Sequence, residues 1–362
     1  MSTHGIRVAI LGLQLDAPRQ LGRFNIHGLD IPTPRGFRKS FRNLLRDGLS
    51  GAFYDRSLLK AEHLDDLYRN RDPQYMAAAE SMIAQLQSFD VVICSTYNPL
   101  HPELLIDRLH NKVKVLGFSD DPHSTYVRGI PYLWAFDAAY YISPGYSPSM
   151  GFASLFEKIG FHRVRWLPLA QPITYPKLSH DQIRHRSVKL AYVGCPTGSK
   201  LDRMRALDKA FGSDFALYGR WRMKGYYGYI RPFLGEPPFF RHVSPISNES
   251  KKRLYLDTMI GFNMHVSDVP SECGNMRTYE TAAFGMMPLC DRAGLNLQRE
   301  IFEEGKEAIY YDSIEEAIDL ARYYLNHPEE RTRIAMAAHQ RACTDYSWEK
   351  VTQDYLEWLM GS

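Results

Sequence analysis

Residues 260–290 decide the fold, and they read IGFNMHVSDVPSECGNMRTYETAAFGMMPLC. The apolar runs at the two ends of this stretch, 260–264 and 287–290, have the length of buried strands, and residues 277–285 between them predict a helix. A strand, a helix and a second strand in this order form a βαβ unit, in which both strands lie parallel in one sheet. The stretch therefore predicts an α/β domain.

The same alternation extends through the rest of the C-terminal half. Further strands are expected at 189–193 and 215–218. Further helices are expected at about 200–211, about 250–258, 314–326 and 328–343. The C-terminal half is therefore predicted to be one α/β domain with a parallel sheet.

The N-terminal half shows a second series of short apolar runs separated by helix-period patterns. Its expected elements are strands at 7–11, 90–94, 112–118, 138–142 and 165–169, with helices at 37–49 and 74–88. Pro168, Pro172 and Pro176, followed by a polar, basic stretch at 179–187, then break the pattern and make 168–187 the linker candidate. We expect a Rossmann-like domain over 1–172, a second one over 187–345, and a last helix over 346–362 that crosses back to the first domain.

The composition excludes several classes of protein. Of the 362 residues, 44% are hydrophobic and 23% are charged, and the net charge of +3 is too small to argue for a nucleic-acid partner. The five cysteines form no C-x-x-C pair, which argues against a disulfide framework and fits a reducing compartment. No apolar stretch approaches the roughly 18 residues that span a bilayer, and no signal peptide is evident. We therefore expect a cytoplasmic protein, and peripheral contact with a membrane surface stays open.

Two carboxylates mark the loop and helix inside the opening stretch. Glu272 and Glu280 are separated by seven residues, and Ser271 is a candidate helix cap. One carboxylate can accept hydrogen bonds from both hydroxyls of a ribose. A second can hold the hydroxyls of a transferred sugar or offset positive charge at an oxocarbenium-like centre.

The positions between these glutamates suit a diphosphate. Gly274 allows close approach of the backbone to a ligand, and free N–H groups at about 274–277, including that of Asn275, would face a pyrophosphate. Arg277 can add a bidentate charge to the same group. The alternative is a solvated pair of carboxylates stabilised by the helix dipole.

These residues resemble the E-x7-E motif of retaining glycosyltransferases with the GT-B fold. The run from Arg277 to Gly285, followed by Asp291, is similar to the R-x-F-E-x-x-A-x-G…D run of the spore-maturation CgeB-like glycosyltransferases. The run Tyr346-Ser-Trp-Glu349 is typical of the last helix of GT-B enzymes. The resemblance implies a GT-B fold, with two Rossmann-like domains facing a central cleft. The first domain would hold the acceptor and the second the nucleoside diphosphate sugar.

The resemblance also implies roles for single residues. Glu280 would bind the ribose and Glu272 the donor sugar, with Arg277 on the diphosphate. The carboxyl end of the strand at 112–118 is followed by Asp121 and His123, which could contact the transferred sugar or the acceptor hydroxyl. Their alternative role is in a helix cap. The order Ser-Asp-Asp-Pro forms no D-x-D motif, which fits a metal-independent enzyme with no cofactor.

A basic pair is expected after the strand at 189–193, where related enzymes contact the donor diphosphate. Lys200 and Arg203 are the candidates here, beside Gly194. The usual Gly-Arg of the family is Gly194-Cys195 in this chain. An exposed basic helix face is the alternative reading of these residues.

Other segments carry weaker signals. Tyr218 and Trp221 lie where the nucleotide base approaches in this fold, and a packed tryptophan is the alternative. Gly12 follows the first strand, as a glycine near the donor phosphate would. The basic and aromatic segment 220–241 could line an acceptor groove, contact a membrane or, least favoured, bind single-stranded nucleic acid.

The sequence thus predicts a hexosyltransferase that uses a nucleoside diphosphate sugar and retains the anomeric configuration. The acceptor, whether saccharide, protein or small molecule, is not specified by these patterns. Two alternatives stay open: a catalytically inactive GT-B-like partner subunit that binds the sugar nucleotide, and a sugar-nucleotide epimerase on the same fold.

Overall fold

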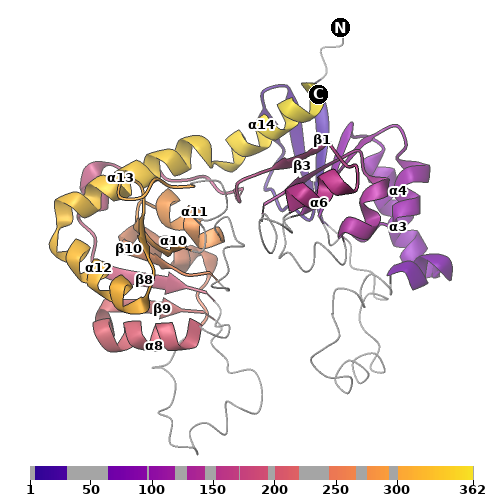
Figure 1. The fold of residues 1–362 in the computed structure, drawn as a ribbon. Coiled ribbons are helices and arrows are strands. Elements are labelled where there is room, and N and C mark those ends of the chain that lie inside the picture. The colour runs from indigo at the N-terminus through magenta and orange to yellow at the C-terminus, as the bar shows by residue number, and fades with distance from the viewer. Residues whose placement is uncertain are drawn as a thin grey trace, which may run out of the picture. The chain divides into compact units, whose positions relative to one another are not determined.

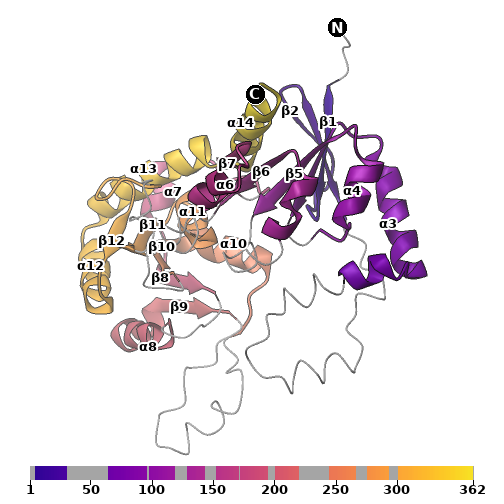
Figure 2. The same ribbon diagram turned by 45° about the vertical axis from the view of Figure 1, so that its right-hand side comes forward.

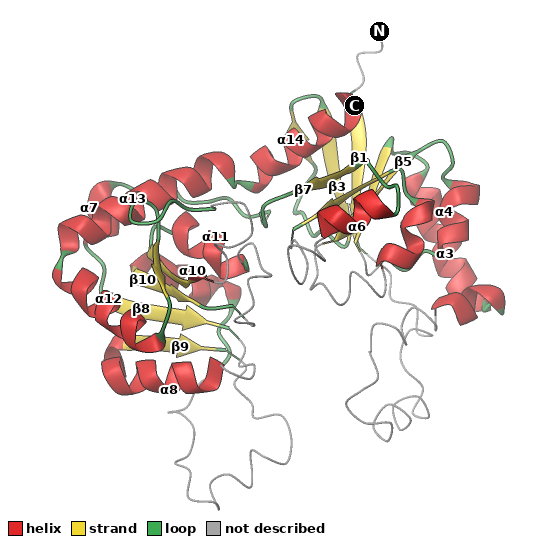
Figure 3. Ribbon diagram, in the orientation of Figure 1, coloured by secondary structure: helices red, strands yellow, loops and turns green. Residues whose placement is uncertain are grey.

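The computed structural model describes residues 5–30, 64–95, 98–118, 129–142, 152–170, 172–194, 200–219, 244–265, 275–292 and 301–361. The chain divides into two compact units. One holds the described residues up to Pro168 and those from Val351 on, and the other holds those between Leu169 and Lys350. Helices and strands alternate in each unit (Figures 1 and 3), which confirms the predicted α/β class.

The first unit is built on a seven-stranded sheet in the order β2-β3-β1-β4-β5-β6-β7. All neighbouring strands run parallel except β2 and β3, which pair antiparallel. The strands are β1 (Ile6–Leu11), β2 (Arg19–Leu21), β3 (Phe24–Leu29), β4 (Val91–Ser95), β5 (Val113–Phe118), β6 (Ala138–Tyr141) and β7 (Val164–Trp166). The helices are α3 (Pro73–Leu86), α4 (Pro102–Arg108), α6 (Phe152–Lys158) and the 3-10 helix η4 (Ile130–Ala135).

Alternate residues along these strands serve opposite faces of the sheet. One face contributes to an apolar cluster that α3, α4 and α6 complete; its strand residues are Ala9, Leu11, Val92, Cys94, Leu116, Phe118 and Ala139. Tyr140, the next residue after Ala139, packs instead against Tyr355 of the last helix, with ring centroids 5.3 Å apart. The last helix therefore covers the face opposite the main cluster.

This last helix, α14 (Trp348–Gly361), belongs to the first unit from Val351 on. Glu357 forms an ion pair with Arg23 at 2.8 Å, and Arg163 donates to the carbonyl of Leu359. Leu356 is fully buried. The final turns of the chain thus complete the core of the domain that the first residues begin.

The second unit has a five-stranded parallel sheet in the order β12-β11-β10-β8-β9. Its strands are β8 (Val188–Val193), β9 (Phe215–Tyr218), β10 (Thr258–Asn263), β11 (Met287–Asp291) and β12 (Ile309–Tyr311). Its helices are α7 (His180–Arg184), α8 (Lys200–Phe211), α10 (Asn248–Asp257), α11 (Met276–Ala283), α12 (Ile314–Asn326) and α13 (Pro328–Asp345). Figure 2 shows α8 beside β9 and α12 beside β12.

The strands expected from apolar runs and most of the expected helices are confirmed within a few residues. The sequence patterns do not predict β2, β3 and β12. β2 and β12 are three residues long, and β3 contains Asn25, His27 and Gly28, so none has the apolar run that marks a buried strand. The expected helix at 37–49 lies outside the described residues.

The expected linker stretch 179–187 contains a helix. Ser179 and Gln182 form a capping box at the start of α7, and Ile183 is buried in the core of the second unit. A polar stretch with one apolar residue gives little periodic signal, because only one side of this short helix touches the core. Among the described residues, no helix is long and apolar enough to cross a membrane.

Candidate functional site

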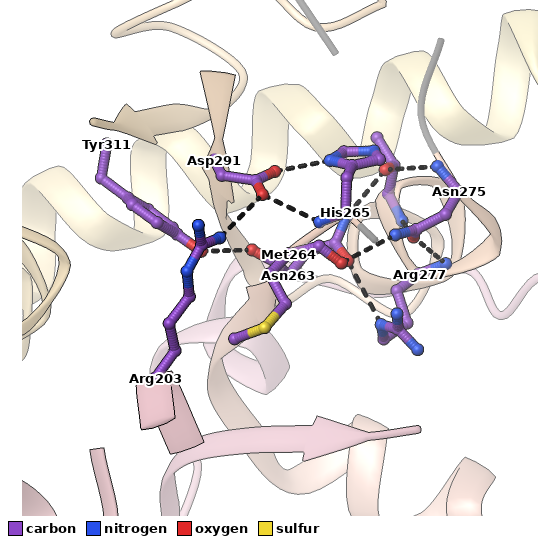
Figure 4. A network of polar contacts seen from close by, with 9 residues as sticks. Arg203, Asn263, Met264, His265, Asn275, Arg277, Asp291 and Tyr311 are labelled. Atoms are coloured by element: carbon purple, nitrogen blue, oxygen red, sulfur yellow. Dashed lines mark hydrogen bonds and ion pairs between the residues drawn. The ribbon is translucent and has the colours of Figure 1, made fainter. Parts of the chain in front are cut away.

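The candidate site lies at the carboxyl edge of the second unit's sheet. All five strands are parallel, so their last residues and the starts of the following helices meet at this one edge. Figure 4 shows side chains from β10, β11 and β12 converging there with Arg203 of α8 and Arg277 of α11.

Arg277 is held in place by three contacts. Its Nε donates to Oδ1 of Asn263 at 3.2 Å, and its Nη1 donates to the carbonyl of Val193 at 3.1 Å. Its guanidinium lies over the ring of Tyr192, 4.5 Å from the centroid. The charge is therefore fixed between the ends of β8 and β10.

Gly194 lies directly against this guanidinium. A Cβ atom at position 194 would be 2.5 Å from Nη1 of Arg277 and 3.0 Å from the ring of Tyr192. The backbone N–H of Gly194 donates to the carbonyl of Tyr218 at 3.0 Å, which joins the ends of β8 and β9. Only glycine leaves room for the arginine here.

The start of α11 is capped differently from the sequence prediction. The cap is Asn275, not Ser271: its Oδ1 accepts from the backbone N–H groups of Arg277 and Thr278, at 3.0 and 3.3 Å. The N–H of Asn275 donates to Oγ1 of Thr278. The N–H groups at 275 and 277 are thus not free for a pyrophosphate, because the cap residue stands where the free donors were expected.

Glu280 is a buried carboxylate with a charged partner. Its side chain is 4% exposed, and its Oε1 lies 2.7 Å from Nζ of Lys251 on α10. This burial contradicts the alternative of a solvated carboxylate. Lys251 balances the charge that Glu280 brings into the protein interior.

His265 and Asp291 form a second charged group at the same edge. Nδ1 of His265 lies 2.5 Å from Oδ1 of Asp291, and the backbone N–H of His265 donates to Oδ2 at 2.8 Å. Nη1 of Arg203 approaches Oδ2 of the same carboxylate at 3.7 Å. The ends of β10 and β11 are therefore joined to the first turn of α8.

The two basic candidates on α8 are not an exposed face. Lys200 is buried, at 3% exposed, and the side chain of Arg203 is 24% exposed. The alternative of a solvated basic helix is therefore wrong for Lys200. The structure brings Arg203 to Asp291, which adds a cation to this edge of the sheet.

Asn263 connects the arginine to the core of the sheet. This buried residue donates to Thr278 Oγ1 at 2.8 Å, and its carbonyl accepts from the hydroxyl of Tyr311 at 2.8 Å. Burial raises the pKa of the Tyr311 hydroxyl well above its usual range, so it remains a donor. Burial also raises the pKa of the neighbouring Cys290 thiol to about 12, which makes this cysteine a poor nucleophile.

The remaining candidates are divided between this edge and other parts of the chain. Tyr218 ends β9 at the same edge. Gly12 lies in the first unit with φ of +80°, and its N–H already donates to the carbonyl of Leu29 at 2.7 Å. Several predicted positions lie outside the described residues: Asp121, His123, Trp221, Glu272, Gly274 and the segment 220–241.

Sequence reasoning missed three residues of this edge: Lys251, Asn263 and His265. A signal existed for the last two, because Asn263 ends one strand and His265 follows it, just as Asp291 ends the next strand. Polar residues at the carboxyl ends of neighbouring parallel strands meet at one edge. Lys251 gave no such signal, because it lies within a helix. Within the described segments, no cluster of His, Cys, Asp and Glu could hold a metal ion.

Comparisons with known proteins bear on the family and the fold. Residues 201–357 match the family model described as glycosyl transferase-like. No curated protein matches the chain in sequence.

Several solved structures share the fold. An alpha-glucosyltransferase in complex with UDP-glucose and DNA containing an abasic site matches 98% of this chain and 100% of its own, with 9% identity and a TM-score of 0.64. Anabaena Alr3699/HepE in complex with UDP-glucose matches 99% of this chain and 100% of its own, with 10% identity and a TM-score of 0.57. TarM matches 78% of this chain at 12% identity and a TM-score of 0.50, and the chain spans 58% of TarM's length.

The solved structures define the fold of this chain as that of GT-B glycosyltransferases, and its match to the glycosyl transferase-like family model covers residues 201–357. Its glycosyl transferase-like segment, 201–357, contains Arg203, Arg277, Glu280 and the rest of the charged edge beyond β8.

Proposed function

We propose that this glycosyltransferase is a retaining hexosyltransferase of the CgeB-like group that takes its sugar from a UDP-sugar. Solved neighbours of the same fold carry UDP-glucose, which supports this donor. The observation that carries the proposal is the fixed guanidinium of Arg277 at the carboxyl edge of the sheet. It supplies a positive charge where this fold class binds phosphates.

Arg277 is proposed to bind the donor diphosphate. A guanidinium has about five N–H donors. Among the described residues, the hydrogen bonds of Arg277 use one donor on Nε and one on Nη1, so others can be directed at phosphate oxygens. Arg203 and Lys200 are proposed to add charge from α8, with Asn275 and Gly194 shaping the backbone around the diphosphate.

Glu280 is proposed to bind the ribose, and Glu272 the transferred sugar. Lys251 holds one oxygen of Glu280, which fixes the carboxylate for hydroxyl recognition. Asp121 and His123 are proposed to contact the sugar or the acceptor, Tyr218 and Trp221 the base, and Gly12 the donor from the first unit.

Retention is proposed to follow from attack on the same face that the diphosphate leaves, with the leaving group assisting the acceptor hydroxyl. The reaction is proposed to need no metal, since arginine and lysine charges can offset those of the diphosphate and the sequence contains no D-x-D motif at 119–122. A cytoplasmic location and an acceptor other than nucleic acid complete the proposal.

Calorimetry with UDP and UDP-glucose tests the donor site. Replacing Arg277 with Met should lower the affinity for both ligands by about 10- to 100-fold, because the variant loses a hydrogen-bonded charge. Arg277→Lys should recover only part of this loss, because lysine cannot form the paired contacts. The matched control is Arg322→Met on the exposed face of α12, which should bind like wild type. Unchanged binding by Arg277→Met would refute the diphosphate role.

NMR of the product separates the mechanisms. The anomeric configuration of the donor should be kept in the glycoside, and an inverted product would exclude retention. Absence of transfer or donor hydrolysis with every sugar nucleotide tried would indicate an inactive binding subunit. Epimerisation of the free donor without acceptor would indicate the epimerase.

A further inference from the structure

The ring of His265 has one nitrogen that its surroundings do not explain. Its side chain is 1% exposed, and Nε2 is buried without a hydrogen-bond partner among the described residues. Buried polar atoms in native proteins nearly always have a partner. His265 lies two residues after the end of β10, at the edge that carries Arg277, so a bound ligand can supply the missing partner.

The other ring nitrogen determines what Nε2 can do. The carboxylate of Asp291 accepts from Nδ1 of His265 with one oxygen and from its backbone N–H with the other, at 2.5 and 2.8 Å. A carboxylate cannot donate a hydrogen, so the ring hydrogen lies on Nδ1. In this tautomer Nε2 carries a lone pair and accepts hydrogen bonds.

The carboxylate beside the ring also has a cationic neighbour. Asp291 already faces the guanidinium of Arg203 at 3.7 Å. The phosphates of a nucleoside diphosphate have no hydrogen to donate near neutral pH, whereas the hydroxyls of a sugar do.

The ring is also tied to the proposed diphosphate site. The side chain of Asn275, the cap of α11, donates to the carbonyl of Met264 at 3.1 Å, immediately before His265. Asn263, two residues before His265, accepts from Arg277. Figure 4 shows the imidazole, the cap and the arginine as parts of one network.

We propose that His265 is a donor-binding residue whose Nε2 accepts a hydrogen bond from a hydroxyl of the transferred sugar. Asp291 is the positioning residue that fixes the tautomer and orientation of the ring. The inference rests on the proposed function, because it assumes a sugar nucleotide at this edge of the sheet.

Two substitutions separate this role from a purely structural one. His265→Asn keeps an amide near the Nδ1 position, which can still donate to Asp291, but it has no atom at the Nε2 position. His265→Gln reaches the Nε2 position with an oxygen that can accept from a hydroxyl, but it loses the group that meets Asp291. If His265 binds the sugar, His265→Asn should bind UDP-glucose more weakly than His265→Gln does. If His265 only contacts Asp291, His265→Gln should be the more impaired variant.

Calorimetry with UDP and UDP-glucose gives the readout. His265→Asn should bind UDP like wild type and UDP-glucose at least about tenfold more weakly, whereas His265→Gln should stay within a few-fold of wild type for both. The inference is overturned if His265→Asn binds UDP-glucose like wild type, or if its affinities for UDP and UDP-glucose fall by the same factor. If the wild-type protein binds neither ligand, the proposed donor itself fails, and this inference fails with it.

A second measurement keeps the test valid if His265→Asn does not fold. Wild-type protein is titrated with UDP-glucose analogues that each lack one sugar hydroxyl, alongside His265→Gln. One deoxy analogue should bind wild type about tenfold more weakly than UDP-glucose, and this difference should shrink in His265→Gln because the replacement bond is poorer. Equal binding of all analogues by wild type would overturn the inference while leaving UDP binding, and thus the donor site, intact.

Discussion

Gly194 and Arg277 touch without room for a side chain between them: a Cβ at position 194 would lie 2.5 Å from Nη1 of the arginine. Nη1 is also the atom that donates to the carbonyl of Val193. The absence of a side chain at the end of β8 therefore determines where the guanidinium sits.

Gly194→Ala should displace Arg277 and weaken donor binding. We expect the Kd for UDP to rise about tenfold, which corresponds to about 1.4 kcal/mol, with little change in secondary structure. Calorimetry measures the affinity and circular dichroism checks the fold. Gly361→Ala is the matched control, since a Cβ there meets nothing within 4 Å, and it should bind normally. Normal UDP affinity in Gly194→Ala would show that Arg277 does not hold the donor.

Glu280→Gln should weaken nucleotide binding without unfolding the second unit. The amide oxygen of glutamine can still accept from Lys251, so most of the buried contact survives, but the ribose hydroxyls lose a charged acceptor. We expect about tenfold weaker binding of UDP by calorimetry. Wild type should prefer UDP over 2′-deoxy-UDP more strongly than Glu280→Gln does. If Glu280→Gln prefers UDP over 2′-deoxy-UDP as strongly as wild type does, Glu280 does not bind the ribose. Glu316→Gln on α12 is the control.

Arg186→Met should destabilise the second unit. The buried guanidinium of Arg186 donates to the carbonyls of Tyr255, Thr258 and Phe284, at 3.3, 2.6 and 2.8 Å. Burial lowers its pKa to about 10, yet it stays charged at neutral pH. Removing it leaves these carbonyls without their donor, and we expect urea unfolding to show a loss of about 2–5 kcal/mol.

The control for this prediction lies two residues away on α7. Arg184 pairs with Glu329, whose side chain is 69% exposed. Arg184→Met should therefore cost only about 0–1 kcal/mol. Equal losses from the two substitutions would mean that Arg186 does not act through its buried carbonyl contacts.

His339 should make the protein sensitive to mild acid. Burial lowers the pKa of this imidazole, in spite of its hydrogen bond to the carbonyl of Ala283. The folded state therefore takes up the proton at lower pH than the unfolded state, whose histidine titrates near pH ~6.5. Between the lowered pKa and about pH 6.5 the unfolded state binds more protons, so stability is full above this window and falls as the pH drops through it.

Thermal unfolding measured against pH tests this expectation. The wild-type midpoint should fall from pH ~7 to pH ~5, and His339→Gln, which cannot titrate, should show a shallower fall. The exposed His180→Gln is the control and should keep the wild-type slope. A wild-type slope in His339→Gln would assign the acid sensitivity to other groups.

Much of the local structure could be read from the sequence, because strand and helix periodicity is a property of neighbouring residues. The apolar run at 260–264 and the helix pattern after it were sufficient to predict β10 and α11. Short or mixed segments such as β3 and α7 were not predictable, because their stability comes from packing partners distant in sequence. The cap of α11 is Asn275 rather than the predicted Ser271, and the sequence pattern does not separate the two because both residue types favour that position.

By itself, the sequence determined the α/β class and predicted a donor site around Glu280 and Arg277. Only the tertiary structure decided which groups meet there: Lys251 with Glu280, and His265 with Asp291 and Arg203. His265 and Asp291, 26 positions apart, come together because β10 and β11 lie side by side and parallel, and Lys251 and Glu280, 29 positions apart, meet because α10 and α11 flank β10 in the chain. Strand order is a property of the whole sheet, so the sequence pattern of each strand does not reveal its partners.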